Sequence, residues 1–226
     1  VGVAGTGVQG SLTIVTNPPS NPPSSPAVSF GNQAVNTASA AKIITVQNSG
    51  AVDINITAFT FSGANASEFS FSPAPTLPIK LSANQSTTIG VVFTPTASGA
   101  RSGSIQLTDD ASGPSSIALT GVGTQPQISL SPANNPFDLG KQALNGTAQK
   151  QLTINNTGNG DLVISALTVS GANANEFTVT LTSGTLPLTI QAGKNASVNI
   201  NFTPAAEGAR NASLSIVHNA PNSPTQ

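Results

Sequence analysis

The chain has 226 residues, a length that fits one or two domains, and only 7% of them are charged, with a net charge of −1. This charge excludes the basic surface that nucleic acids and anionic membranes require. The absence of Cys excludes disulfides, thiolate metal sites and thiol nucleophiles. Because the sequence also lacks Met, we expect a processed product or a segment of a longer protein. No apolar run approaches the roughly 20 residues needed to span a bilayer.

The first eight residues have the pattern of a strand that belongs to another domain. Residues 1–7 (VGVAGTG) match residues 117–123 (IALTGVG), in which alternating apolar residues are followed by glycines. This pattern is typical of a strand and its exit. We therefore predict that residues 1–8 complete the C-terminal domain of a neighbouring copy. The residues expected to make the contacts are Val1, Val3, Ala4, Thr6 and Val8.

Residues 11–124 form the first of two repeats. SGANASEF at 62–69 returns as SGANANEF at 170–177, 108 residues later, and VFTPTASGAR at 92–101 returns as NFTPAAEGAR 109 residues later. A unit of this size indicates a sandwich domain rather than a solenoid repeat. A Pro-rich insert at 17–26 interrupts the first strand of this repeat, and we expect it to be extended and stiff.

Residues 126–226 form the second repeat, and its apolar residues alternate with polar ones. Leu152 and Ile154 alternate in one segment, and Ser197–Phe202 and Ser213–Val217 show the same period of two. This period is typical of half-buried antiparallel strands, and no segment has a helical apolar stripe. The sequence therefore predicts an all-β fold of two tandem immunoglobulin-like antiparallel β-sandwiches.

The second repeat ends before a counterpart of the closing strand at 117–123. We expect an open hydrophobic groove there, filled either within a long continuous polypeptide or by the N-terminal strand of a separate subunit. The third interpretation is that the sequence ends at this point for no functional reason. The residues expected to form the receiving core are Val198, Ile200, Phe202, Leu214 and Ile216.

No set of residues has the pattern of a catalytic, cofactor-binding or metal site, and we expect no cofactor. The single histidine, His218, falls in a predicted turn and is interpreted as solvated. Asp109 and Asp110 are paired in a predicted hairpin, but a calcium site needs about 6–8 oxygen ligands. We therefore interpret this pair as a solvated turn.

Charged residues that recur in both repeats are interpreted as structural. Glu68 and Glu176 occupy equivalent positions, and we expect them to accept N–H groups from the adjacent Gly-Ala-Asn turn. The phenylalanines that follow them are expected to be core anchors. Arg101 and Arg210 are expected to bind carbonyls or to pair locally.

The order of N-x-G, SGANxxEF, LP, FTPxxxGxR and a closing LTGxG resembles the bacterial choice-of-anchor D repeats, which are related to the abnormal-spindle/Hydin-type immunoglobulin-like domains. The resemblance covers nearly the whole chain, twice. It implies a seven-stranded immunoglobulin-like sandwich, usually found in tandem in large secreted or surface-anchored proteins. It implies no catalytic residues.

The sequence thus predicts a non-enzymatic structural subunit or repeat unit of an extracellular filament or stalk. Neighbouring units would assemble head-to-tail by sharing a β-strand, as a homopolymer or a continuous array. The expected partner is the chain itself, with no nucleic acid and no membrane insertion, and the expected location is the cell surface or its exterior. The alternative is a spacer or binding module of a large cell-surface adhesin, with a glycan or protein ligand.

Overall fold

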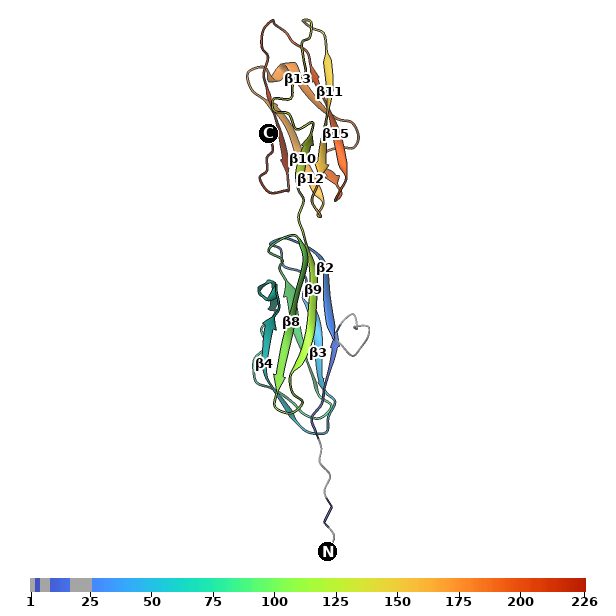
Figure 1. Cartoon of the computed structure of the whole chain (residues 1–226), viewed down its shortest axis with the longest axis vertical. Coiled ribbons are helices and arrows are strands. Elements are labelled where there is room, and N and C mark those ends of the chain that lie inside the picture. The colour runs from blue at the N-terminus through green and yellow to red at the C-terminus, as the bar shows by residue number, and fades with distance from the viewer. Residues whose placement is uncertain (1–2, 5–8, 17–25) are drawn as a thin grey trace. The chain divides into compact units, whose positions relative to one another are not determined.

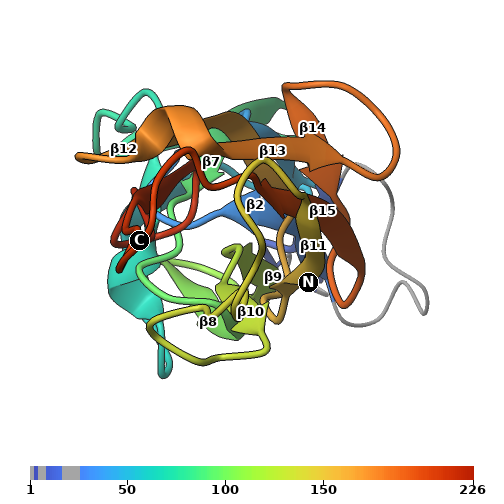
Figure 2. The same cartoon turned by 90° about the horizontal axis from the view of Figure 1, so that it is seen from above.

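The computed structural model describes residues 3–4, 9–16 and 26–226, and the chain divides into two compact units, Val1–Thr124 and Gln125–Gln226. Each unit is a sandwich of two β-sheets whose strands run along the length of that unit (Figures 1 and 2). Among the described residues, the helical segments are two short 3₁₀ turns, η1 (Ala66–Glu68) and η2 (Ala174–Glu176). The predicted fold of two all-β sandwiches is confirmed.

No helix in the part of the chain that the structure describes has the length and apolar character needed to cross a membrane.

The N-terminal unit contains a four-stranded and a five-stranded sheet. The first has the order β1 (Leu12–Thr16), β3 (Lys42–Asn48), β7 (Ser86–Phe93) and β5 (Phe69–Phe71). The second has the order β2 (Ala27–Ala34), β9 (Ser115–Thr124), β8 (Gly99–Asp109), β4 (Ile54–Ser62) and β6 (Ile79–Leu81). Neighbouring strands are antiparallel except β2 and β9, which are parallel.

The start of the first repeat changes sheet between β1 and β2. Residues 17–25, which contain most of the Pro-rich insert, lie between these strands and outside the described residues. The extended conformation expected for this insert therefore stays a prediction.

The C-terminal unit repeats this architecture with fewer strands. Its four-stranded sheet has the order β10 (Ile128–Ser131), β11 (Ala148–Asn156), β15 (Asn195–Phe202) and β13 (Phe177–Leu181). Its other sheet has only three strands, β14 (Leu188–Ile190), β12 (Leu162–Ser170) and β16 (Ser213–His218). Strands corresponding to β2 and β9 do not occur among the described residues of this unit.

The core of each unit lies between its two sheets and is built from the alternating apolar residues. Leu152 and Ile154 on β11 are buried, as the period-two pattern predicts. The same holds for Val198, Ile200 and Phe202 on β15. Burial of these side chains is the main stabilising term of each sandwich, and each contributes about 1.5–3 kcal/mol.

A buried asparagine braces one turn in each unit, and sequence reasoning did not single it out. Asn48 donates from Nδ2 to the carbonyls of Val52 and Leu81, and its Oδ1 accepts the N–H of Gly50. Asn156 makes the same three bonds, to Gly160, Ile190 and Gly158. The amide thus satisfies backbone groups that the interior would otherwise leave unpaired. Its recurrence in VQNSG and INNTG is the signal that could have identified it.

Candidate functional site

Strand β16 has an open edge that its counterpart in the N-terminal unit does not have. There, β8 pairs with β4 on one edge and with β9 on the other. β16 pairs with β12 on the first edge. On the second edge, the pairing given by the described residues is one isolated bridge between Ile216 and Thr225. Most of this edge therefore lacks a strand partner within the described chain.

Residues 208–212, which precede β16, are not in a strand, although the matching residues 99–103 begin β8. The reason is visible in the pairing of β8. Its residues 99–103 pair with β9 alone, whereas β4 begins to pair with it at Ser104. Without a strand in the place of β9, residues 208–212 have no strand partner among the described residues.

Residues 136–143 behave in the same way. The matching segment of the N-terminal unit, residues 27–34, is β2, and its ladder partner is β9. FGNQA at 30–34 is part of this strand, whereas the similar LGKQA at 139–143 is irregular. Two sequences of one pattern thus adopt different conformations because only one of them has a neighbouring strand.

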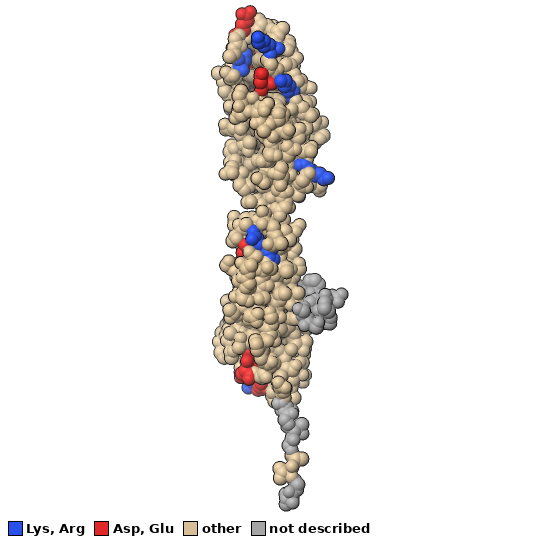
Figure 3. Space-filling view, viewed as in Figure 1, with Lys and Arg blue, Asp and Glu red and all other residues tan. Residues whose placement is uncertain are grey.

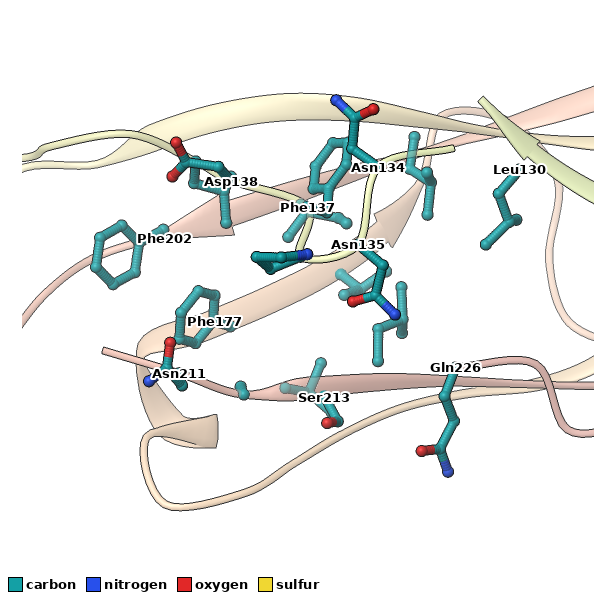
Figure 4. Close-up of a pocket in the computed structure, with 18 of the residues that line it drawn as sticks. Leu130, Asn134, Asn135, Phe137, Asp138, Phe177, Phe202, Asn211, Ser213 and Gln226 are labelled. Carbon is teal, nitrogen blue, oxygen red and sulfur yellow. The ribbon is translucent and has the colours of Figure 1, made fainter. Parts of the chain in front are cut away.

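Between these segments lies an apolar groove of about 550 Å³, called the β16 groove below. Its wall residues come from the loop at 132–140, from β13, β15 and β16, and from residues 210–212. Phe177 and Phe202 lie at one end of it and Leu130 at the other, while Phe137 projects from the loop (Figure 4). The groove lies beside β16, the strand whose counterpart β8 pairs with β9 in the N-terminal unit.

Burial in the two units differs where the groove opens. Ile105 on β8 is fully buried, whereas Leu214, its counterpart on β16, is partly exposed. Phe69 is buried, whereas its counterpart Phe177 is partly exposed. A further strand beside β16 would therefore bury apolar surface that the groove now exposes to water.

An ion pair lies at the aromatic end of the groove. Arg210 donates from Nε to Glu176 Oε2 at 2.9 Å and from a terminal nitrogen to Oε1. Glu176 is buried, and the hydrogen bond from Arg210 lowers the pKa of its carboxyl. Glu176 and Arg210 thus balance each other's charge at this end, while the carboxylate of Asp138, which accepts the N–H of Gly140, also lines the groove.

The equivalent residues of the N-terminal unit are arranged differently. Arg101 donates to the carbonyls of Ala97 and Ser98, and buried Glu68 accepts from the N–H and the hydroxyl of Thr96. The expectation that the glutamates accept N–H groups of the Gly-Ala-Asn turn is wrong, because the Glu68 carboxylate accepts from Thr96 and the Glu176 carboxylate accepts from Arg210. The expected roles of the two arginines are confirmed.

Asparagine side chains brace the Gly-Ala-Asn turns instead. Oδ1 of Asn65 accepts the N–H of Ser102, and Oδ1 of Asn173 accepts the N–H of Asn211. In the N-terminal unit this bond ties the 3₁₀ turn to β8, and in the C-terminal unit it ties the turn to the irregular residues that precede β16.

Four of the five residues predicted to receive a strand line the groove, namely Ile200, Phe202, Leu214 and Ile216. Val198 is fully buried in the core and does not line it. On the predicted donor segment, Val3 is 94% exposed and Ala4 is exposed, and neither lies in a strand. Val1, Thr6 and Val8 lie outside the described residues. That the donor and the receiving residues act together stays a prediction.

His218 is buried, so its interpretation as a solvated turn residue is wrong. It ends β16, and the chain after it folds back over its ring. Its Nδ1 accepts the N–H of Ala220 at 3.2 Å, and its Nε2 lies 2.9 Å from the hydroxyl of Thr225. Burial lowers the pKa of the imidazole. Nothing in the sequence indicates this fold-back.

The paired aspartates are structural turn residues. Asp109 accepts the N–H groups of Ala111 and Ser112, and Asp110 accepts the N–H and the side-chain amide of Asn55. Within the described ranges, no three His, Cys, Asp or Glu side chains gather as metal ligands. The face seen in Figure 3 is almost entirely uncharged, in keeping with the 7% of charged residues.

The strand orders and the internal repeat define a tandem immunoglobulin-like sandwich protein. The chain belongs to the ASH family (abnormal spindle-like microcephaly-associated, ASPM-SPD-2-Hydin), whose sequence profile matches residues 13–117 and 126–226. The relationship that the repeat motifs indicate is confirmed.

Solved structures similar to the chain include a Porphyromonas gingivalis W83 protein of unknown function, with 16% identity, coverage of 94% of both chains and a TM-score of 0.34. PapD-like domain 7 of human CEP192 is 13% identical over 50% of this chain and 84% of that one, with a TM-score of 0.36. The E. coli chaperone DraB is 13% identical over 92% and 90%, with a TM-score of 0.34. No curated protein matches the chain. These similarities are too low to carry a function over to it.

Proposed function

We propose that the chain is a structural unit of an extracellular filament or stalk, in which neighbouring units share a β-strand. The N-terminal residues 1–8 of one copy enter the β16 groove of the next and complete its C-terminal sandwich. Main-chain hydrogen bonds to β16 and burial of alternate apolar side chains would hold this strand.

The observation that carries the proposal is the position of Thr225. It pairs with Ile216 just as Ser115, the first residue of β9, pairs with the matching Leu107. Gln226 therefore corresponds to Ser116, and the next position to Ile117. Residues 1–7 match the sequence from Ile117 onward, so they supply the residues that the groove lacks.

Strand sharing of this kind propagates. The donor segment and the groove lie on different units of the chain, so the contact joins two different surfaces of neighbouring copies. A contact of this type is heterologous, and one that does not close into a ring continues as a filament. An uncharged, hydroxyl- and amide-rich surface is in keeping with a location outside the cell.

The test is deletion of residues 1–8, followed by light scattering and electron microscopy. We expect the intact chain to form assemblies and the deleted chain to remain a folded monomer. Assemblies that persist without residues 1–8 would contradict strand sharing.

The mass of denatured native material separates the two forms that strand sharing can take. A species near 22.4 kDa indicates separate subunits that exchange strands, and a much larger species indicates one continuous repeat polypeptide. Monomeric material that binds a glycan or a protein, without assembling, would favour the adhesin module instead.

A further inference from the structure

We propose that the β16 groove accepts a strand in one register only and that Gly5 and Gly7 of a second copy are its specificity-determining residues. This inference rests on the proposed function, since it identifies which residues of the donor strand the groove recognises. It is argued from β9, which occupies the corresponding space in the N-terminal unit.

The register follows from the pairing of β8 with β9. Ile105 pairs with Ile117, Gly103 with Leu119 and Arg101 with Gly121. The matching residues of the C-terminal unit are Leu214, Ala212 and Arg210. The donor residues that match β9 are Val1, Val3 and Gly5. Val1 is therefore placed opposite Leu214, Val3 opposite Ala212 and Gly5 opposite Arg210.

Glycine is required in β9 because neighbouring atoms fill the space of a side chain. A Cβ atom on Gly121 would lie 2.4 Å from Cε1 of Phe93, and one on Gly123 would lie 2.1 Å from the carbonyl oxygen of Ala97. Neither distance is compatible with a side chain unless the core moves. Both glycines are buried, on the same face of β9 as Ile117 and Leu119.

The obstructing groups are present in the C-terminal unit as well. Phe202 corresponds to Phe93, and it stacks on Phe177 with ring centroids 4.8 Å apart. The ring of Phe93 stacks on Phe69 at 5.0 Å, so the two aromatic pairs have the same arrangement. By sequence, Ala206 corresponds to Ala97. A donor strand must therefore carry glycine where it crosses Phe202 and again two residues later.

Each shifted register fails, for one of three separate reasons. A shift by two residues in one direction places Val3 over Phe202, where a side chain has no room. A shift by two in the other direction places Gly5 opposite Ala212 and leaves the space of Leu119 empty. A shift by one residue turns Val1 and Val3 away from the core. The pattern apolar-x-apolar-x-Gly-x-Gly thus fits the groove in a single position.

The test uses the full chain carrying Gly5→Val as the acceptor, since its own N-terminal segment no longer fits the groove. The probes are fluorescent peptides of residues 1–9 in three forms: unchanged, Gly5→Val and Thr6→Val. Thr6→Val is the matched control, because β9 has Val122 at this outward-facing position. Binding is measured by fluorescence anisotropy.

We expect the unchanged and Thr6→Val peptides to bind with similar affinity. The Gly5→Val peptide should bind roughly ten- to 100-fold more weakly, the effect expected for overpacking. Equal binding of the Gly5→Val peptide, or polymerisation of the Gly5→Val chain, would overturn the glycine requirement and leave strand sharing intact. If none of the three peptides binds, the proposed function fails together with this inference.

Discussion

Ile216 and Thr225 exchange two backbone hydrogen bonds, at 2.9 Å and 3.0 Å, in the position that Leu107 and Ser115 hold in the N-terminal unit. The hydroxyl of Thr225 also lies 2.9 Å from Nε2 of His218, so two residues of β16 hold this one residue. The contact fixes the end of the described chain on the edge of β16. It places that end where the strand equivalent to β9 would begin.

Filling of the β16 groove should extend the strands around it. Residues 137–143 and 208–212 would gain the strand partner that β9 gives to their counterparts. The exchange rate of their amide hydrogens should therefore fall by roughly tenfold or more. The measurement is hydrogen exchange of the Gly5→Val chain with and without the unchanged peptide of residues 1–9. β2 is the internal reference, because its exchange should not change. Bound peptide with unaltered exchange at 137–143 would contradict this coupling.

The glycine requirement can be tested inside the N-terminal unit, where no assembly is needed. Gly121→Ala should lower the free energy of unfolding of this unit by about 1–3 kcal/mol, because the new methyl group meets the buried ring of Phe93. Ala118→Val, on the outward face of the same strand, should change it by less than about 0.5 kcal/mol. Urea unfolding measures the change in the free energy of unfolding for both variants. Equal stability of the two variants would remove the basis for assigning a role to Gly5.

Loss of the buried turn amide should destabilise the C-terminal unit. Asn156→Ala leaves the carbonyls of Gly160 and Ile190 without the donor they now have, and we expect a loss of about 3 kcal/mol in the free energy of unfolding. Asn195→Ala is the control. Because this side chain is exposed, its loss should change the free energy of unfolding by less than about 0.5 kcal/mol. Thermal or urea unfolding of the two variants gives the comparison. A loss as small as that of the control would mean that the turn does not depend on this amide.

His218 should make the stability of the C-terminal unit depend on pH. Burial lowers its pKa below the ordinary value of about 6.5, so the unfolded chain binds more protons than the folded one as the pH falls below that value. The stabilising contribution is complete above the unfolded pKa and is lost as the pH falls through the folded pKa. Protonation of Nδ1 would also remove the acceptor of the Ala220 N–H.

The corresponding measurement is thermal unfolding between about pH 7 and pH 5, the range around the ordinary histidine pKa. We expect the intact chain to lose stability across this range and His218→Gln to lose much less. The N-terminal unit has no histidine, so its transition serves as an internal control. A slope that is unchanged in His218→Gln would show that other groups are responsible.

Much of the fold could be read from the sequence because the relevant interactions are local or repeated. Alternation at Leu152 and Ile154 identifies a half-buried strand whatever its partner is. The return of SGANxxEF and FTPxxxGxR identifies two copies of one domain. The match between residues 1–7 and 117–123 predicts a strand like β9 at the N-terminus, and four of the five predicted receiving residues line the groove.

What the sequence could not give depends on atoms that come together only in three dimensions. His218 was misread because its burial is produced by a tail that folds back over it. The irregular conformation of the loop around Phe137 could not be predicted from the sequence, because the similar sequence at 27–34 forms a strand. The reason for glycine at 121 is the position of the Phe93 ring, which lies on another strand.

The sequence by itself thus determined that this protein consists of two β-sandwich repeats and that residues 1–7 have the pattern of a closing strand. Side-chain periodicity and repetition are properties of the chain that need no partner to be recognised. The sequence also predicts an open groove in the second repeat, but only the tertiary structure decided that its open edge belongs to β16, that residues 136–143 and 208–212 are irregular beside it, and which atoms limit what can bind there. The physical reason is that a β-strand is completed by hydrogen bonds to a neighbour, and whether a neighbour is present cannot be read from the strand itself.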